Sequence, residues 1–226
     1  MPLASRVTDP GPIASSTVQL ILIRHGESHH TVRDIASSEQ GCLGLTDRGR
    51  GQADALRTRF ASERRRVDVL LSSTADRARQ TAEILRPALG TDTVVTDRDL
   101  CELRLGRGDG LPRADFEARY GSFDLVAAPD RPVCPDGESW NDFRNRVHTT
   151  LNTLATTYRG KTVAAVTHAG VIVVGFMTLF AIPRPGTGTR IDPDFASVTE
   201  WEHDDTTDNW RLIRFNDTAH LRYETT

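Results

Sequence analysis

Lysine is almost absent from this sequence. Of the 28 basic residues, 27 are arginine, and Lys161 is the single lysine. Codon bias in a GC-rich genome explains this balance without any function, although the forked guanidinium of arginine also matches phosphate oxygens best. The net charge is −3 and the sequence pI is near 6.2. This charge gives no electrostatic case for binding nucleic acid or an anionic membrane surface.

Cysteine is scarce as well. Cys42, Cys101 and Cys134 are odd in number and widely spaced, and they form no CxxC pair. The sequence therefore offers no disulfide framework, and we expect a reducing, cytoplasmic compartment.

Long apolar runs are missing too. The run 163–166 and the stretch 171–182 are both too short to span a bilayer. Residues 1–17 hold proline and glycine breakers and an aspartate in place of an apolar run, so we interpret them as a flexible N-terminal tail and not as a signal peptide. The rest of the 226-residue chain, 18–226, is expected to form one soluble domain.

What the sequence does contain is an alternation of short apolar runs with helical patterns. Residues 18–23 (VQLILI) form a continuous apolar run, typical of a strand buried on both faces of a parallel sheet. Thr46 is the expected N-cap of the first long helix, and Pro87 is expected to kink a later helix or end it early. The predicted strands are 18–23, 67–71, 94–95, 162–167, 197–201 and 210–215, and the predicted helices are 46–61, 74–89, 113–120, 140–158 and 169–180. The alternation predicts an α/β fold with three layers, α/β/α, around a mostly parallel sheet, and the last two strands form a hairpin.

This pattern breaks between the third strand and the helix that begins at Trp140. The stretch is rich in glycine, proline and charge, and it is too short for an independent core. We interpret residues of about 103–135 as a small lid insertion over one end of the sheet.

Reactive side chains follow the predicted strands. Arg24 and His25 come after the first strand, the hydroxyls of 72–74 after the second, Glu102 after the third, and His168 after the fourth. Because ligands of open α/β sheets bind outside the carboxyl ends of the strands, we expect these groups to converge.

These residues suit transfer of a phosphoryl group. A nucleophilic His25 must be neutral, with its ring held at the other nitrogen, and we expect Gly26 to let the backbone turn and leave an N–H facing that ring. Arg24 and Arg77 can bind the phosphoryl oxygens and offset their negative charge, and His168 can donate a hydrogen bond to the same phosphoryl group. Glu102 is the carboxylate placed to protonate a leaving alcohol. No phosphate-binding glycine loop and no Asp-rich cluster is present in the sequence, so neither a metal nor another cofactor is predicted.

Four segments carry a resemblance to a known family. Leu22-Ile23-Arg24-His25-Gly26-Glu27 resembles the Arg-His-Gly signature of the histidine phosphatase superfamily, in its phosphoglycerate mutase-like branch. The segments 71–82, 136–139 and 166–170 are similar to further family segments, in the same order. The resemblance implies that His25 becomes phosphohistidine, that Arg24, Arg77 and His168 hold the phosphate, and that Glu102 is the proton donor.

The sequence also departs from the family pattern. Thr31 stands where many members have a phosphate-binding asparagine, and the lid lacks the longer, arginine-paired insert of the glycolytic mutases. The departures favour a phosphatase over a mutase, with a small phosphorylated metabolite as substrate. Candidates for contact with the substrate are Ser28, His29, His30, Arg104 and Arg113.

Three other functions are alternatives for this sequence. A phosphoglycerate mutase-type phosphotransferase and a non-catalytic binder of phosphorylated ligands both fit the fold. A metal hydrolase with histidine ligands is disfavoured because the arginine neighbours would repel a cation. A homodimer through an edge strand or a helix face is the suggested oligomeric state.

Overall fold

The computed structural model describes residues 17–122, 127–183 and 190–221. Its centre is one six-stranded sheet with the order β3-β2-β4-β1-β5-β6. The strands are β1 (Thr17–Arg24), β2 (Val69–Ser72), β3 (Val95–Thr96), β4 (Thr162–Thr167), β5 (Val198–Asp204) and β6 (Asn209–Asp217). β1 to β4 run parallel, and β5 and β6 add an antiparallel hairpin beside β1. The predicted α/β class and mostly parallel sheet are confirmed.

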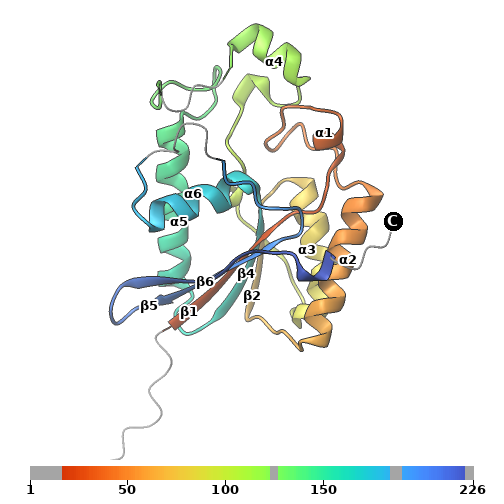
Figure 1. Ribbon diagram of the computed structural model, residues 1–226, viewed down its shortest axis with the longest axis vertical. Coiled ribbons are helices and arrows are strands. Elements are labelled where there is room, and N and C mark those ends of the chain that lie inside the picture. The colour runs from red at the N-terminus through yellow and green to blue at the C-terminus, as the bar shows by residue number, and fades with distance from the viewer. Residues whose placement is uncertain (1–16, 123–126, 184–189, 222–226) are drawn as a thin grey trace, which may run out of the picture.

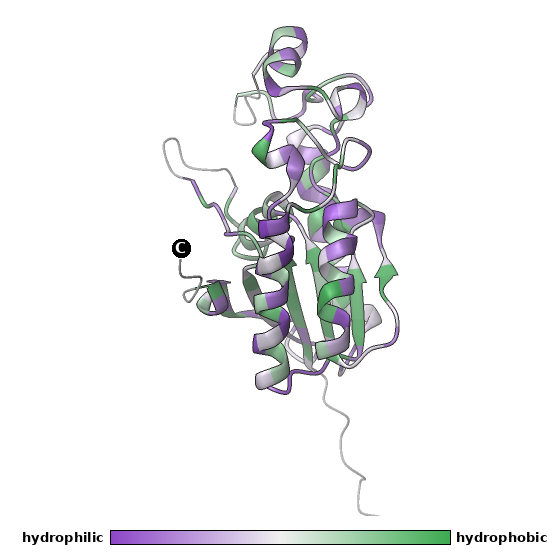
Figure 2. Ribbon diagram, turned by 90° about the vertical axis from the view of Figure 1, so that its right-hand side faces the viewer, coloured by the Kyte–Doolittle hydropathy of each residue, from purple (hydrophilic) through white to green (hydrophobic). Residues whose placement is uncertain are grey.

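Helices cover both faces of the sheet, with α2 and α3 on one side and α5 and α6 on the other (Figure 1). The helices are α1 (His29–Val32), α2 (Asp47–Ser62), α3 (Asp76–Leu89), α4 (Arg113–Tyr120), α5 (Trp140–Thr157) and α6 (Ala169–Leu179), with short 3-10 turns η1 (Arg98–Leu100), η2 (Gly106–Gly108) and η3 (Ala219–Leu221). Figure 2 shows α2 and α3 in front of the apolar strands, with polar residues along their outer surfaces. None of the helices in the described part of the chain is long and apolar enough to cross a membrane.

Successive side chains of β1 point into two different apolar cores, which explains why its sequence is apolar without interruption. Leu20 and Leu22 pack into the cluster beneath α5 and α6, whereas Ile21 and Ile23 pack into the cluster beneath α2 and α3. All four side chains are fully buried. Each such burial stabilises the fold by about 1.5–3 kcal/mol, so a polar residue at any of these positions would be costly.

Helix boundaries confirm one prediction and correct another. Thr46 caps α2, since its hydroxyl oxygen accepts from the N–H of Gly49 at 3.0 Å. Of the two effects predicted for Pro87, a kink or an early end of the helix, the early end is wrong, because α3 continues to Leu89, as predicted, and stops at Gly90, which has a left-handed φ of 73°. The kink stays a prediction. Pro87 lies in the last turn, where a proline removes a single helical hydrogen bond, and the buried neighbours on this helix hold the turn against the core.

The segment predicted as a lid carries η2 and α4 above the sheet, at the top of Figure 1. It has a small apolar cluster of its own, centred on Phe116 and including Leu105 and Val133. A β-bridge between Ile35 and Pro112 ties it to the loop after α1. The lid boundaries and the single domain remain predictions. The predicted tail lies outside the described residues, except that its last residue, Thr17, begins β1.

The register of the parallel strands brings three chain segments together. β4 lies between β1 and β2, with Arg24 opposite Thr167 and Ser72 opposite Val166. The residues that follow these strands therefore emerge side by side at one edge of the sheet. The candidate site is built there.

Candidate active site

His25 follows the last residue of β1, and both of its ring nitrogens are held. Nδ1 lies 2.7 Å from the carbonyl oxygen of Gly26, and Nε2 lies 3.1 Å from Nε of Arg77. A guanidinium can only donate, so Nε2 must accept and Nδ1 must carry the proton. This tautomer leaves a lone pair on Nε2, the state that a nucleophilic histidine requires.

Gly26 holds the ring in the opposite sense to the prediction. Its carbonyl oxygen faces the ring, while its N–H donates to Oγ1 of Thr81 at 3.2 Å. Nε2 of His25 already accepts from Arg77, so the ring proton is on Nδ1 and an acceptor is needed beside Nδ1. A Cβ at position 26 would lie 2.3 Å from the carbonyl oxygen of Gly49, so the close approach of α2 requires glycine.

The electrostatic surroundings keep His25 neutral. Burial lowers its pKa well below 6.5, and the positive charges of Arg77 and Arg24 lower it further. Burial and the positive charge of Arg77 also lower the pKa of His168. Two neutral imidazoles therefore lie among cationic groups, an environment that favours an anionic ligand.

Buried donors without partners surround His25. Nε of Arg24, Nη1 of Arg77 and Nδ1 of His168 are buried, and none has a hydrogen-bond partner among the described residues. The ring centroid of His168 lies 5.1 Å from that of His25. An unpaired buried donor costs about 1–3 kcal/mol, and a ligand bound beside His25 would supply the missing acceptors to all three groups at once. Phosphoryl oxygens have that chemistry.

Each of these donors is placed by a neighbour. Oγ of Ser73, the residue after β2, accepts from the N–H of Ala75 at 3.3 Å and donates to Nε2 of His168 at 2.7 Å, which leaves the ring proton of His168 on Nδ1. Arg77 stands in the first turn of α3 and is 1 % exposed. Arg24 stacks on Phe195, with 4.0 Å from its guanidinium carbon to the ring centroid, and pairs with Asp192 at 3.7 Å.

Glu102 is held by two backbone groups. Its Oε2 accepts from the N–H of Gly170 at 2.9 Å, and its Oε1 accepts from the N–H of Leu103 at 3.0 Å. A Cβ at position 170 would lie 2.0 Å from Oε1, so glycine is required at the start of α6 for the carboxylate to approach. This side chain thus joins the start of the lid segment to the first turn of α6.

A cavity of about 530 Å³ opens at these residues. Arg24, His25, Arg77 and Glu102 line it, whereas His168 is fully buried behind them. Part of its further wall is apolar and aromatic, formed by Ile35, Ala36, Leu103, Leu105, Trp140 and Phe143, and the remainder is mostly polar or charged. The side chains that carry the chemistry therefore share a space large enough for a small metabolite.

The predicted substrate contacts divide into two groups. His30 and Arg113 line the cavity, and so does Thr31, which is predicted to bind phosphate. The pKa of His30 is lowered to about 3, chiefly by burial and then by the charge of Arg77, so this ring is neutral at ordinary pH. Arg113 is paired with Asp34 at 2.8 Å.

The other candidates do not line the cavity. Ser28 is fully buried and its hydroxyl lies 2.9 Å from Nδ1 of His30. His29 is half-buried at the start of α1. Arg104 points instead to Asp99, at 2.9 Å. The roles of all six residues remain predictions.

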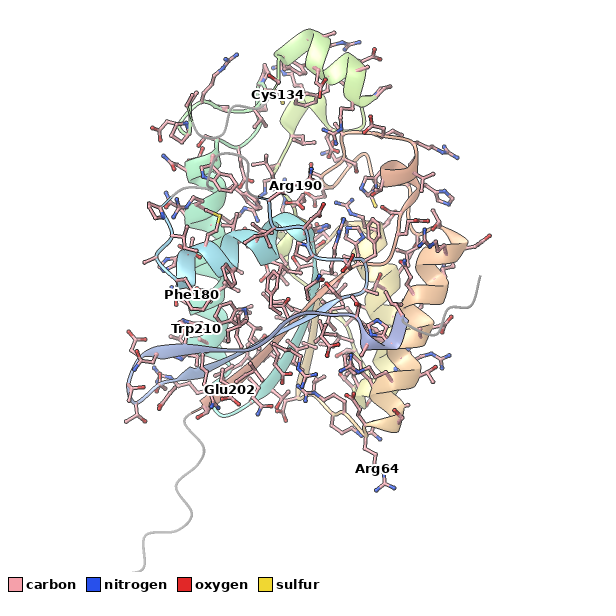
Figure 3. The ribbon with its side chains drawn as sticks, viewed as in Figure 1. Arg64, Cys134, Phe180, Arg190, Glu202 and Trp210 are labelled. Atoms are coloured by element: carbon pink, nitrogen blue, oxygen red, sulfur yellow. The ribbon has the colours of Figure 1, made fainter. Side chains whose placement is uncertain are left out.

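Arg190 reaches the same cavity from a segment that the sequence analysis did not assign. Figure 3 places it between α6 and the lid segment that carries Cys134. It pairs with Asp192 at 3.1 Å, and Asp192 pairs in turn with Arg24. No strand or helix pattern marks this segment in the sequence, so it gave no signal.

No group of three or more His, Cys, Asp or Glu side chains within residues 17–122, 127–183 and 190–221 is arranged to hold a metal ion. The metal-hydrolase alternative gains no ligand set from this part of the chain.

Comparison with known proteins gives a consistent result. A family model described as histidine phosphatase superfamily (branch 1) matches residues 20–218. The chain is 30% identical over 210 residues to phosphoglycerate mutase-like protein 4 of Arabidopsis thaliana, covering 90% of this chain and 86% of the relative. It is 30% identical over 214 residues to a metal-independent phosphoserine phosphatase of Arabidopsis thaliana, covering 92% and 85%.

Solved structures agree. A mycobacterial glucosyl-3-phosphoglycerate phosphatase, in complex with VO3, matches with a TM-score of 0.70 and 26% identity, over 88% of this chain and 98% of that one. A phosphoglycerate mutase from Bacillus anthracis matches with a TM-score of 0.75 over 92% and 96%, at 20% identity, and this likeness speaks for the fold alone.

Proposed function

Because the chain belongs to the histidine phosphatase superfamily (branch 1), we propose that it hydrolyses phosphomonoesters of small metabolites through a phosphohistidine at His25. One observation carries the proposal. The accepting Nε2 of a neutral, buried His25 stands among three buried donors that have no partner in the described part of the chain. Transfer of a phosphoryl group to a side chain requires a nucleophile and hydrogen-bond donors that bind the phosphoryl oxygens.

The first step forms the bond between Nε2 of His25 and phosphorus and breaks the bond between phosphorus and the ester oxygen. Arg24, Arg77 and His168 hold the phosphoryl oxygens during this step, and Glu102 gives its proton to the leaving alcohol.

The second step returns the enzyme to its starting state. Glu102, now a carboxylate, takes a proton from water, and the oxygen of that water attacks phosphorus. The bond from phosphorus to Nε2 breaks, His25 is again neutral, Glu102 is again protonated, and inorganic phosphate leaves. Water supplies both the oxygen and the proton, so the cycle consumes nothing else.

The chain's own arginines support hydrolysis over a mutase reaction. A mutase must retain the phosphorylated acid within the site while the phosphoryl group moves between two of its oxygens. Here Arg107 and Arg104 lie outside the cavity lining. The two arginines that line it besides Arg24 and Arg77 are each paired with a carboxylate, Arg113 with Asp34 and Arg190 with Asp192. The mutase reaction stays the second candidate, because several relatives are named for it.

Replacement of His25 tests the proposal. His25→Ala is expected to lower kcat/KM for p-nitrophenyl phosphate by about 10³-fold or more, because the nucleophile is lost. Rapid quenching of the natural-sequence protein with a radiolabelled ester, followed by alkaline work-up, should leave label on His25. His148→Ala, on the exposed face of α5, is the matched control and should keep full activity. Near-full activity of His25→Ala would refute the proposal.

A second assay separates the two candidate reactions. With 3-phosphoglycerate as substrate, a phosphatase releases inorganic phosphate, whereas a mutase produces 2-phosphoglycerate without releasing phosphate. Assays in the presence of a chelator test the predicted independence from metal.

The setting proposed for this activity is the cytoplasm, with small-molecule phosphate esters as partners and without nucleic acid or membrane. Three free cysteines, two of them buried, support a reducing compartment. The net charge of −3 supports the absence of nucleic-acid partners. The homodimer stays a prediction, to be tested by light scattering.

A further inference from the structure

Arg146, on α5, reaches across to the loop that carries Glu102. Its Nη1 donates to the carbonyl oxygens of Asp99 at 2.7 Å and Cys101 at 2.9 Å, and its Nη2 donates to the carbonyl oxygen of Glu102 at 3.2 Å. The side chain is 9% exposed. One guanidinium thus holds three carbonyl groups of the chain that leads into the proposed acid.

The other edge of the guanidinium is held by a carboxylate. Nε and Nη2 of Arg146 bind the two oxygens of Glu138 at 2.6 and 2.7 Å. Glu138 also accepts from the backbone N–H of Arg104 at 2.9 Å, and its own N–H donates to the carbonyl oxygen of Arg104 at 2.9 Å. The chain is therefore fixed on both sides of Glu102.

A guanidinium has five N–H groups, and each of those of Arg146 has an acceptor in this arrangement. Lysine offers three donors from a single point and lacks the planar fork, so it cannot reproduce the set. The arrangement is specific to arginine.

Glu102 lies just beyond η1 in a loop without helix or strand, so its position depends on such contacts. Its carboxylate meets Gly170 only if the loop keeps this course. We propose that Arg146 is the positioning residue for Glu102: with Glu138, it fixes the loop so that the carboxyl group faces the leaving oxygen of the substrate. The inference rests on the proposed function.

The test compares a poor leaving group with a good one. Arg146→Gln should lower kcat/KM for an alkyl phosphate such as β-glycerophosphate by about 10²-fold, because departure of an alkoxide needs the proton from Glu102. For p-nitrophenyl phosphate, whose leaving group needs no proton, the loss should stay within about threefold. Arg146→Lys should show the same ratio, since the charge alone does not hold the loop.

A double variant shows whether Arg146 acts through Glu102. With the alkyl phosphate, Arg146→Gln combined with Glu102→Gln should be no slower than Glu102→Gln alone. A further loss in the double variant, or equal losses with both esters, would overturn the proposal. If Arg146→Gln does not fold, Arg146→Lys carries the same double-variant test.

Arg59→Gln is the matched control. Arg59 also binds two carboxylates, Glu63 and Asp217, each at 2.7 Å, and its side chain is 15% exposed, but it joins α2 to the end of β6, away from the cavity. The Arg59→Gln variant should lower the stability of the fold without changing the ratio of kcat/KM between the two esters. Inactivity of the natural-sequence protein toward both esters would count against the proposed function itself, and is thus distinct from failure of this inference.

Discussion

His25 shows how few contacts decide the state of a residue. Its Nδ1 has a carbonyl acceptor in Gly26, and its Nε2 has a donor in Arg77, so the proton is assigned without reference to any substrate. The donor at Nε2 also marks where a phosphoryl group would arrive. Because an electrophile at Nε2 must displace this hydrogen bond, Arg77 becomes free to bind a phosphoryl oxygen at the same moment.

The acid role proposed for Glu102 predicts that its replacement affects poor and good leaving groups differently. Glu102→Gln removes the acid but keeps the size of the side chain. The expected result is a loss of about 10²–10⁴-fold in kcat/KM for alkyl phosphates and a much smaller loss for p-nitrophenyl phosphate. A series of aryl phosphates of graded leaving ability measures this, and a uniform slowing across the series would speak against an acid role.

Among the elements, the ends of β1, β2 and β4 contribute most of the site. They deliver His25, Ser73 and His168 to adjacent positions, since parallel strands end at the same edge of the sheet. The first turn of α3 adds Arg77, and the first turn of α6 adds the N–H of Gly170. Rigid elements therefore position the proposed phosphate-binding groups, whereas the proposed acid, Glu102, comes from a loop that side chains must hold.

Gly170→Ala is expected to separate activity from stability. The new Cβ would meet Oε1 of Glu102 at 2.0 Å and displace the carboxylate, so activity toward alkyl phosphates should fall about tenfold. The free energy of unfolding should change by less than about 1 kcal/mol, because alanine is the better helix former. Urea unfolding and steady-state kinetics measure the two quantities.

Gly51→Ala is the control for this prediction. Nothing lies within 4 Å of a Cβ at this exposed position of α2. The variant should gain about 0.5–1 kcal/mol of stability and keep its activity. Full activity of Gly170→Ala toward alkyl phosphates would contradict the placement of Glu102.

At the scale of the whole molecule, the neutral histidines tie the stability of the fold to pH. The pKa values of His25, His168 and His30 are all lowered, by burial first and by Arg77 second. An unfolded histidine takes up a proton below pH ~6.5, whereas these remain neutral in the fold. The unfolded state therefore gains protons first, and stability is lost as the pH falls below that value.

His30 allows a quantitative test of this linkage. Because the folded pKa of His30 is about 3, lowering the pH from 7 to 5 protonates this residue only in the unfolded state, and the fold should lose about 2 kcal/mol of stability. Urea unfolding of His30→Gln should show a dependence on pH smaller by that amount, and the exposed control His148→Gln should behave like the natural sequence. An unchanged pH dependence in His30→Gln would show that its folded pKa is not lowered.

The sequence by itself determined the class of fold, the family and the main candidates for the chemistry. Apolar periodicity records which face of an element is buried, and the continuous run before Arg24 therefore predicted a central strand. Because the ends of parallel strands converge, the sequence alone predicts that the residues that follow each strand form one site. His25, Arg24, Arg77 and Glu102 do line one cavity.

Only the tertiary structure decided which groups face one another. It turned the carbonyl of Gly26 toward His25, carried α3 past Pro87, and left Ser28, His29 and Arg104 outside the cavity lining. It also joined Arg146 to the loop of Glu102, more than 40 positions away in the chain. Periodicity records burial, but a contact between distant side chains depends on how the elements pack, and no local pattern encodes it.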